Sequence, residues 1–251
     1  MKKIAVITPY YNEDLDLIKK ANESVLNQNN KEFECEHIII VDGYDNNNYL
    51  KNLDCFSLEL KENHKDNGNT PRSFGTNLAI SKKYDYIMYL DADNWFLENH
   101  TKTLFDLIKF ENTIGCSYRT FFTLDCEKLD YLEDSDSLQK KHVDTSCYLI
   151  PSIFFKFINI WHLIPKPTSQ WCDRIFLNNL IKNKIPLKFS EKHTVAFRSL
   201  YEVHYQKNKD KYPKNIKVNS QMNKNAYEYF SDKSNQETFN QLFGFTWKVN
   251  S

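Results

Sequence analysis

The sequence predicts an α/β fold in which a mainly parallel central sheet is flanked by helices, with a smaller subregion in the second half of the chain. Short runs of apolar and β-branched residues alternate with segments of helical spacing. The 251 residues suit one large domain, or one domain with an appendage. Polar side chains follow three of the apolar runs, at Thr8, Asp42 and Asp91, where sheets of this kind bind their ligands.

The first half of the chain alternates strands with helices. Residues 4–8 predict a buried strand, and Asn12 is expected at the N-cap of a helix whose apolar positions continue to residue 25. A second strand is expected at residues 37–42, before Gly43. The elements that follow are a weaker strand at 57–60, a helix after the Pro71 turn and a strand at 86–90.

The second half is less regular. Strands are expected at residues 116–124, 144–150 and 195–205. One helix is expected after Pro151, ending near residue 160, and another at residues 171–182. The polar, acid-rich residues 125–143 predict a mobile loop. After residue 206 the chain is rich in Lys, Asn and Tyr, and it has only short apolar clusters.

Composition excludes several classes of protein. With 33 basic and 33 acidic residues the formal charge is zero, which argues against a nucleic-acid partner. The apolar run at the start is broken at Pro9, too early for a signal peptide, and no run of about 18 apolar residues predicts a membrane span. Six cysteines without a C-x-x-C pair indicate reduced thiols of a cytoplasmic protein and no zinc site.

The tripeptide Asp91-Ala92-Asp93, directly after a buried strand, predicts a metal site. Hard carboxylate oxygens suit Mn²⁺ or Mg²⁺, and such ions bridge the oxygens of a diphosphate. In transfer from a nucleotide sugar, the metal would neutralise the charge that develops on the leaving diphosphate. The alternative is a solvated turn that caps the next helix.

Four segments in order resemble the inverting family 2 glycosyltransferases, which have the GT-A fold with a metal-binding D-x-D motif. They are Ile4–Glu13, with its Pro and Asn-Glu; Val41-Asp42-Gly43; Asn67-Gly68 with Asn77 on a helix; and Tyr89–Asn94. The resemblance covers residues 4–96 well and continues more loosely to about residue 205. It implies that residues 1–96 bind the nucleotide sugar, that 97–205 bind the acceptor and hold the catalytic group, and that 206–251 form an extension.

The resemblance also implies roles for individual residues. Asp42 would bond the base, Asp91 would contact the ribose or the donor sugar, and Asp93 would bind the metal. The remaining donor-binding residues would be Thr8, Pro9, Tyr10, Glu13, Arg72, Asn77 and Ala92. For Glu13 the alternative is stabilisation of the first turn of a helix, and for Asp42 an ordinary turn.

The chain departs from the family pattern at two places. A single acid, Asp42, precedes Gly43 where the family often has two. Thr76 stands where an Arg usually precedes the Asn that is Asn77 here, so Arg72 would reach the phosphates instead, unless it is a solvated turn residue.

Inversion needs a carboxylate that takes the proton of the acceptor hydroxyl. By its position in the family pattern this general base is Asp173, in Trp171-Cys172-Asp173, although the Glu that often precedes it is missing. Asp144 is the second candidate for the base, and a helix cap is the alternative role of Asp173. Trp171 would stack on a sugar ring or lie in the core. His204 matches a family His that touches the metal or the diphosphate; its alternative is structural.

These features predict an inverting hexosyltransferase that uses a uridine diphosphate sugar and a glycan or lipid-linked glycan acceptor, in bacterial surface polysaccharide biosynthesis. The absence of a Q-x-x-R-W signature favours single additions. The aromatic residues 154–161 would touch the inner face of the cytoplasmic membrane, or pack in the core or a dimer interface. The oligomeric state is left open.

Two other classes compete. A nucleotidyltransferase would need a Gly-rich phosphate loop with a basic residue after the first strand, and Pro9–Glu13 has neither. A non-catalytic module that binds a sugar or nucleotide on the same fold would not need Asp91, Asp93 and Asp173.

Overall fold

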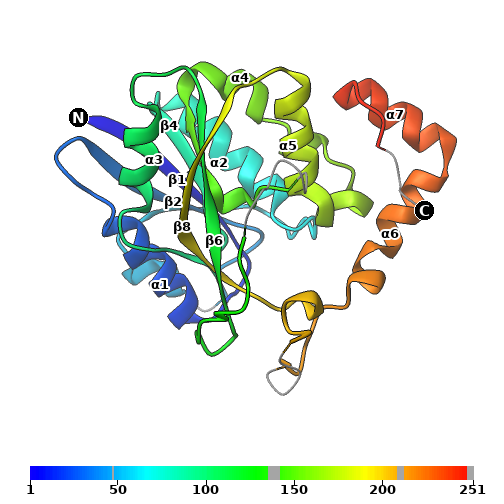
Figure 1. Ribbon diagram of the computed structural model, residues 1–251, viewed down its shortest axis with the longest axis horizontal. Coiled ribbons are helices and arrows are strands. Elements are labelled where there is room, and N and C mark those ends of the chain that lie inside the picture. The colour runs from blue at the N-terminus through cyan, green and yellow to red at the C-terminus, as the bar shows by residue number, and fades with distance from the viewer. Residues whose placement is uncertain (47, 135–141, 208–211, 248–251) are drawn as a thin grey trace.

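The computed structural model describes residues 1–251 except 47, 135–141, 208–211 and 248–251 (Figure 1). One eight-stranded sheet forms its centre, in the order β3-β2-β1-β4-β7-β6-β8-β5. The strands are β1 Lys2–Tyr10, β2 Phe33–Val41, β3 Phe56–Glu59, β4 Tyr86–Tyr89, β5 Trp95–Phe96, β6 Ile114–Phe122, β7 Tyr148–Pro151 and β8 Leu187–Arg198.

The half of the sheet from β3 to β4 is parallel, as expected. In its register Ile7 of β1 lies between Ile38 of β2 and Tyr89 of β4. The other half is mixed: β7 runs antiparallel to β4 and β6, and β8 runs parallel to β6 but antiparallel to β5. Because β1, β2 and β4 run in the same direction, their carboxyl ends share one edge of the sheet.

Helices cover both faces of the sheet. They are α1 Leu15–Leu26, α2 Asn69–Ser81, α3 His100–Ile108, α4 Phe155–Ile158, α5 Cys172–Lys182, α6 Asn219–Ser231 and α7 Lys233–Phe243. In Figure 1, α1 and α3 lie on one side of the strands, and α2 and α5 on the other. The strands of the parallel half are buried on both faces, and Ile4, Ile39 and Met88 are fully buried.

Two predicted boundaries in the first half are wrong. Asn12 is not an N-cap: its φ is 57°, a left-handed conformation that Asn tolerates, and Asp14 precedes α1 instead. Helix α2 begins at Asn69, so that Pro71 lies in its first turn, where a missing N–H costs nothing.

The second half differs more from the prediction. The strand expected to continue to residue 205 ends at Arg198 because the Ser199 hydroxyl accepts a hydrogen bond from the N–H of Tyr201 and turns the chain. The expected strand at 144–150 starts as a 3₁₀ turn, Thr145–Cys147, before β7. Of the predicted loop 125–143, the described parts contain no helix or strand, and the remainder lies outside the described residues.

The C-terminal extension forms two helices that the sequence did not predict. Helices α6 and α7 lie beyond α5 at the edge of the molecule (Figure 1). Their aromatic side chains pack with Trp171, whose ring stacks on Phe230 and Trp247 at centroid distances of 6.0 and 5.5 Å. The Trp171 indole N–H donates to Asn223, at 2.7 Å. Trp171 is therefore buried in this aromatic packing, and it also lines the cavity described below.

The aromatic segment 154–161 packs inside the molecule. Phe154, Phe155, Ile158 and Trp161 are buried, and the Trp161 ring stacks on Phe176 with centroids 4.5 Å apart. This packing favours the core alternative for the segment. Among the described helices none has the length and apolar character needed to cross a membrane. All six cysteines are free thiols, as expected, and three of them are buried.

Candidate active site

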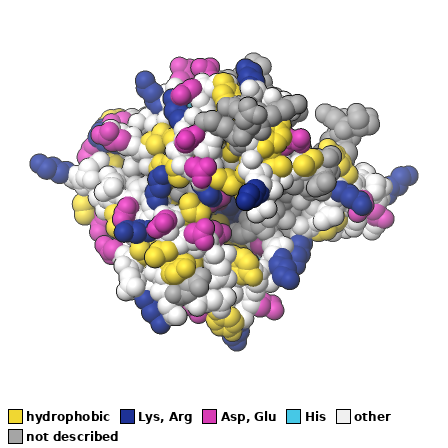
Figure 2. All heavy atoms as spheres, turned by 90° about the horizontal axis from the view of Figure 1, so that it is seen from below, with side chains coloured by type: hydrophobic (Ala, Val, Ile, Leu, Met, Phe, Trp, Pro, Cys, Tyr) yellow, Lys and Arg dark blue, Asp and Glu magenta, His cyan; other side chains and the backbone are white. Residues whose placement is uncertain are grey.

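A cavity of about 1030 Å³ lies at the edge of the sheet where β1, β2 and β4 end. Most of the predicted site residues line it: Pro9, Tyr10, Glu13, Asp42, Arg72, Asp91, Ala92, Asp93, Asp144, Asp173 and His204. On the surface shown in Figure 2, acidic, basic and hydrophobic side chains are intermixed around the centre of the molecule. This mixture agrees with the zero net charge of the chain.

Two predicted donor-binding residues lie away from the cavity, which corrects their assignment. Thr8 points into the core, where it is fully buried and its hydroxyl shares a 2.8 Å hydrogen bond with His37 Nε2. Asn77 is on the exposed side of α2 and accepts a hydrogen bond from the Asn159 amide. In both cases the alternation of faces along a strand or helix turns the side chain away from the site.

Arg72 enters the cavity from the first turn of α2. Its Nη2 atom pairs with Asp91 at 2.5 Å and its Nη1 atom donates to the Asn67 carbonyl at 2.8 Å. Burial disfavours the charge, but Asp91 outweighs burial and raises the pKa of Arg72, so the guanidinium stays charged. Gly68 allows this approach: its φ is +77°, and a Cβ there would lie 2.7 Å from Pro9 Cβ.

Three carboxylates crowd the end of β4. Burial, Asp91 and Glu13 together raise the pKa of Asp93 to about 7. Burial likewise raises the pKa of Glu13, with a smaller contribution from Asp91. Such crowding is unfavourable unless a cation compensates it. Among the described residues, however, no three His, Cys, Asp or Glu side chains form a group that could hold a metal ion.

Asp42 already has protein partners. Both of its carboxylate oxygens accept from the backbone N–H of His64, at 3.0 and 3.2 Å, and Oδ1 also accepts from His64 Nδ1 at 2.7 Å. Asp42 therefore fixes the loop after β3 at the rim of the cavity, and any contact with a nucleotide base would use its remaining acceptor capacity.

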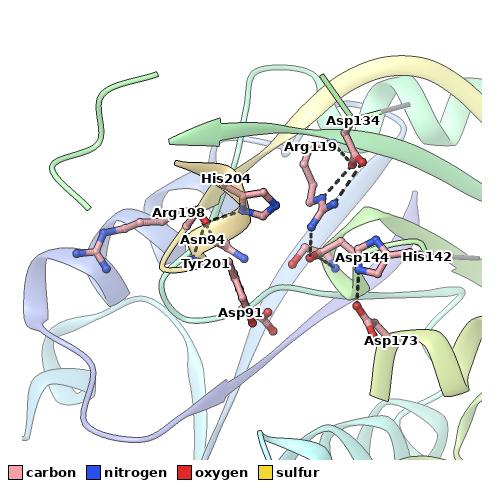
Figure 3. A network of polar contacts seen from close by, with 12 residues as sticks. Asp91, Asn94, Arg119, Asp134, His142, Asp144, Asp173, Arg198, Tyr201 and His204 are labelled. Atoms are coloured by element: carbon pink, nitrogen blue, oxygen red, sulfur yellow. Dashed lines mark hydrogen bonds and ion pairs between the residues drawn. The ribbon is translucent and has the colours of Figure 1, made fainter. Parts of the chain in front are cut away.

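A second network of polar side chains lines the cavity (Figure 3). Asp173, in the first turn of α5, pairs with His142 Nε2 at 2.5 Å. Although burial acts to raise the pKa of Asp173, the attraction of His142 outweighs it and holds that pKa below its ordinary value. Asp173 is thus an ionised carboxylate at neutral pH.

Asp144 is tied to a buried arginine. Arg119 Nη1 lies 3.5 Å from Asp144 Oδ2, and Arg119 Nε and Nη2 donate to Asp134 at 2.9 and 3.2 Å. Burial raises the pKa of Asp144 in spite of Arg119. Arg119, Asp134 and His142 were not among the predicted site residues. The signal for Arg119 was a lone charge within the apolar run of β6, because a charge inside a buried strand needs partners.

His204 lies in a 3₁₀ turn, Glu202–His204, and not in a strand. Its Nδ1 atom is hydrogen-bonded to the Ser199 hydroxyl at 2.6 Å, and its ring packs against Phe121 with centroids 4.6 Å apart. Burial lowers the pKa of His204 to about 4, so the imidazole is neutral at physiological pH. A neutral imidazole is the form that binds metals.

The C-terminal extension also reaches the cavity. Lys217 and Asn223, both after residue 206, line it together with residues of the first and second halves of the chain. The sequence analysis assigned neither residue, because nothing in the local pattern shows that the extension folds back over the site.

Together the fold and the site define an α/β protein with a cavity beyond the carboxyl ends of parallel strands, lined by carboxylates from separate parts of the chain. The chain belongs to a family of this class, glycosyl transferase family 2, whose model matches residues 5–181. This match confirms the predicted family.

Solved structures agree on the fold. The crystal structure of S. aureus TarS 1–349 superposes with a TM-score of 0.60 and shares 14% sequence identity with this chain. The match covers 79% of this chain and 60% of the TarS chain. TarS 1–349 in complex with UDP-GlcNAc matches with a TM-score of 0.61 at 14% identity, over 79% of this chain and 59% of that one. The chain therefore spans about three fifths of those structures, and the predicted GT-A fold is confirmed. No curated protein matches the sequence.

Proposed function

We propose that this protein is an inverting glycosyltransferase that moves a hexose or N-acetylhexosamine from a uridine diphosphate sugar to a hydroxyl of a glycan or glycolipid. One observation carries the proposal: Asp42, Asp93 and Asp173, far apart in the chain, line a single cavity at the carboxyl edge of the sheet. Acids brought together from three regions into a polar cavity stabilise the fold poorly, so a ligand is the reason for their arrangement.

The donor occupies the wall formed by residues 1–96. Pro9, Tyr10 and Asp42 hold the nucleoside, whereas Arg72 and Asp91 face the sugar phosphate. The complex of TarS with UDP-GlcNAc, a protein of similar fold, supports a uridine diphosphate N-acetylhexosamine as the first donor to test.

Mn²⁺ or Mg²⁺ fits the crowded carboxylates, since a cation would offset both the burial and the repulsion from Asp91 and Glu13 that raise the pKa of Asp93. Asp93 would hold the ion, with neutral His204 as the second protein ligand, and diphosphate and water oxygens would complete its coordination. When bound, the ion would neutralise charge on the departing diphosphate.

Asp173 is the general base. Its carboxylate takes the proton of the acceptor hydroxyl as that oxygen attacks the anomeric carbon from the side opposite the diphosphate, which inverts the configuration. Because His142 keeps Asp173 ionised, the base depends on position and not on a raised pKa. Both acids accept a backbone N–H, but Asp144 is less available because its other partner is the buried guanidinium of Arg119.

The acceptor binds along residues 97–205, and the extension from residue 206 closes the remaining side of the cavity. We propose that the acceptor is a bacterial surface glycan or its lipid-linked precursor and that the enzyme works at the cytoplasmic side of the membrane. The family membership supports the glycan acceptor, whereas the buried aromatic segment 154–161 does not support a membrane contact.

The test is incubation with uridine diphosphate sugars, Mn²⁺ and a panel of glycan acceptors. Release of UDP is measured, and the anomeric configuration of the product is read by NMR. Asp173→Asn should lower kcat by about 10²–10⁴-fold and leave donor binding intact. The exposed Asp130→Asn is the control, with a side chain 78% accessible.

A retained configuration would overturn the inverting mechanism, and full activity of Asp173→Asn would remove Asp173 as the base. Donor binding without transfer to any acceptor would favour a non-catalytic module. Release of pyrophosphate from a sugar phosphate and UTP would favour a nucleotidyltransferase.

A further inference from the structure

We propose that Lys217, in the C-terminal extension, binds the diphosphate of the donor and stabilises it as the leaving group. The inference rests on the proposed function, and it adds a residue outside the segment 5–181 that matches the family model. It makes the extension part of the donor site.

The backbone of Lys217 is fixed beside the cavity. Its N–H donates to the Leu200 carbonyl at 2.7 Å, and its carbonyl accepts from the N–H of Glu202 at 3.1 Å. These bonds pair Lys217 with Tyr201 in a short parallel bridge. The extension is therefore attached to the segment between β8 and His204, which itself lines the cavity.

The side chain of Lys217 lies at the cavity. Its Nζ atom lies 5.6 Å from the centroid of the Tyr201 ring, and Tyr201 and Lys217 both line the cavity. Asp93 lines the same cavity, so a ligand in it can contact both the ammonium of Lys217 and the end of the cavity at which the carboxylate of Asp93 lies.

Two of the arginines that line the cavity have protein partners. Arg72 is bound to Asp91 and to the Asn67 carbonyl. Arg198 Nε donates to the Leu124 carbonyl at 2.9 Å, and its guanidinium points away from Asp173 and His142 in Figure 3. Lys217 is more than one third exposed, on a flexible side chain that can turn from Tyr201 to a phosphate.

A diphosphate bound between Asp93 and Lys217 would explain why the Lys217 ammonium lies at a cavity lined by acids and yet forms no direct ion pair with Asp93. The departing diphosphate gains negative charge as the glycosidic bond breaks, and a compact ammonium stabilises that charge. Lys217 therefore contributes to the affinity for nucleoside diphosphates and little to the affinity for the nucleoside itself.

The experiment is isothermal titration of UDP and uridine into the full chain, with Mn²⁺ and separately with EDTA. The variants are Lys217→Ala and, as a matched control, Lys214→Ala, which removes an exposed lysine from the same segment. Lys217→Ala should weaken UDP binding by about tenfold in both buffers and leave uridine binding unchanged, because one charge-assisted contact is lost. Lys214→Ala should bind both ligands like the wild type.

Equal UDP affinities of Lys217→Ala and the wild type would overturn the inference and leave the proposed function intact. An equal loss for UDP and uridine would also overturn it, since it would show a general disturbance of the cavity. If the wild type binds neither UDP nor uridine in either buffer, the proposed function and the inference both fail.

Discussion

At the scale of single residues, the two candidate bases differ in their partners. Each accepts a hydrogen bond from a backbone N–H, but Asp173 is paired with a histidine, whereas Asp144 is paired with a buried arginine. The difference between these partners is the reason for proposing Asp173 as the base. A histidine on a loop can give way to an acceptor hydroxyl more easily than a buried arginine can.

Replacing His142 by Gln should shift the acid limb of the kcat/KM profile to higher pH. Burial acts to raise the pKa of Asp173, but His142 outweighs it by charge and hydrogen bond. Without His142 that pKa rises, so Asp173 is protonated, and inactive as a base, at a higher pH. The measurement is kcat/KM across the acid and neutral range. An unshifted acid limb would mean that the limb does not report Asp173.

Replacing Asp134 by Asn should cost about 3–5 kcal/mol of stability at neutral pH, because it leaves Arg119 buried with an incomplete partner. Burial alone would raise the pKa of Asp134, but Arg119 lowers it below 3.8 in the folded state. A carboxyl group whose pKa is lower in the folded than in the unfolded state stabilises the fold at pH values above its unfolded-state pKa. The stabilisation is lost as the pH falls through the folded-state pKa.

Urea unfolding at several pH values measures this effect. The difference between the wild type and Asp134→Asn should be complete at neutral pH and shrink below about pH 3.8. Asp130→Asn, which breaks an exposed pair with Lys128, should cost about 0–1 kcal/mol and serves as the control. A difference between the wild type and Asp134→Asn that stays constant down to the acid transition would contradict the assignment.

At the scale of elements, the position of α2 depends on its close approach to β1. Gly75 faces Ile7, and a Cβ at residue 75 would overlap the Ile7 side chain. This contact sets the depth of α2 on the sheet, and with it the reach of Arg72 into the cavity. Glycine in the middle of a helix lowers the stability of the helix, so the presence of Gly75 here reflects packing against β1.

Gly75→Ala should therefore destabilise the protein by about 1–3 kcal/mol, despite the better helix propensity of Ala. Ser81→Ala, at the exposed end of the same helix, should be nearly neutral. In a double-mutant cycle by urea unfolding, Ile7→Ala should cost less in the Gly75→Ala background than in the wild type, because it makes room for the new methyl group. Additive effects would show that the two side chains do not compete for space.

At the scale of the whole molecule, the cavity is assembled from three parts of the chain. Asp93 comes from the first half, Asp173 from the second and Lys217 from the extension. The match to the family model stops at residue 181, before the extension begins. A ligand that touches all three parts should stabilise the entire fold, since it binds only when they are together.

UDP with Mn²⁺ at about a hundredfold excess over its Kd should add about 2.7 kcal/mol, which raises Tm by roughly 5–10 °C for a chain of this size. Differential scanning fluorimetry measures the shift. In Asp93→Ala, Mn²⁺ should no longer increase the Tm shift, whereas the Tm shift caused by UDP in the presence of EDTA should be unchanged. An equal response of Asp93→Ala and the wild type to Mn²⁺ would remove Asp93 as the metal ligand.

Much of the donor side could be predicted from local pattern. The strands that end before Asp42 and Asp91 are continuous apolar runs, and parallel strands bring their carboxyl ends together whatever the loops do. Thr8 and Asn77 show the limit of this reasoning, because position near a strand end or on a helix does not fix the direction of a side chain.

The sequence by itself determined the α/β class, the acids at the strand ends and the family, because apolar periodicity and short motifs are local properties of the chain. Only the tertiary structure decided the antiparallel half of the sheet, the pairs of His142 with Asp173 and of Arg119 with Asp134, and the return of the extension to the cavity. These depend on contacts between residues far apart in the chain, whose free energy no local pattern encodes.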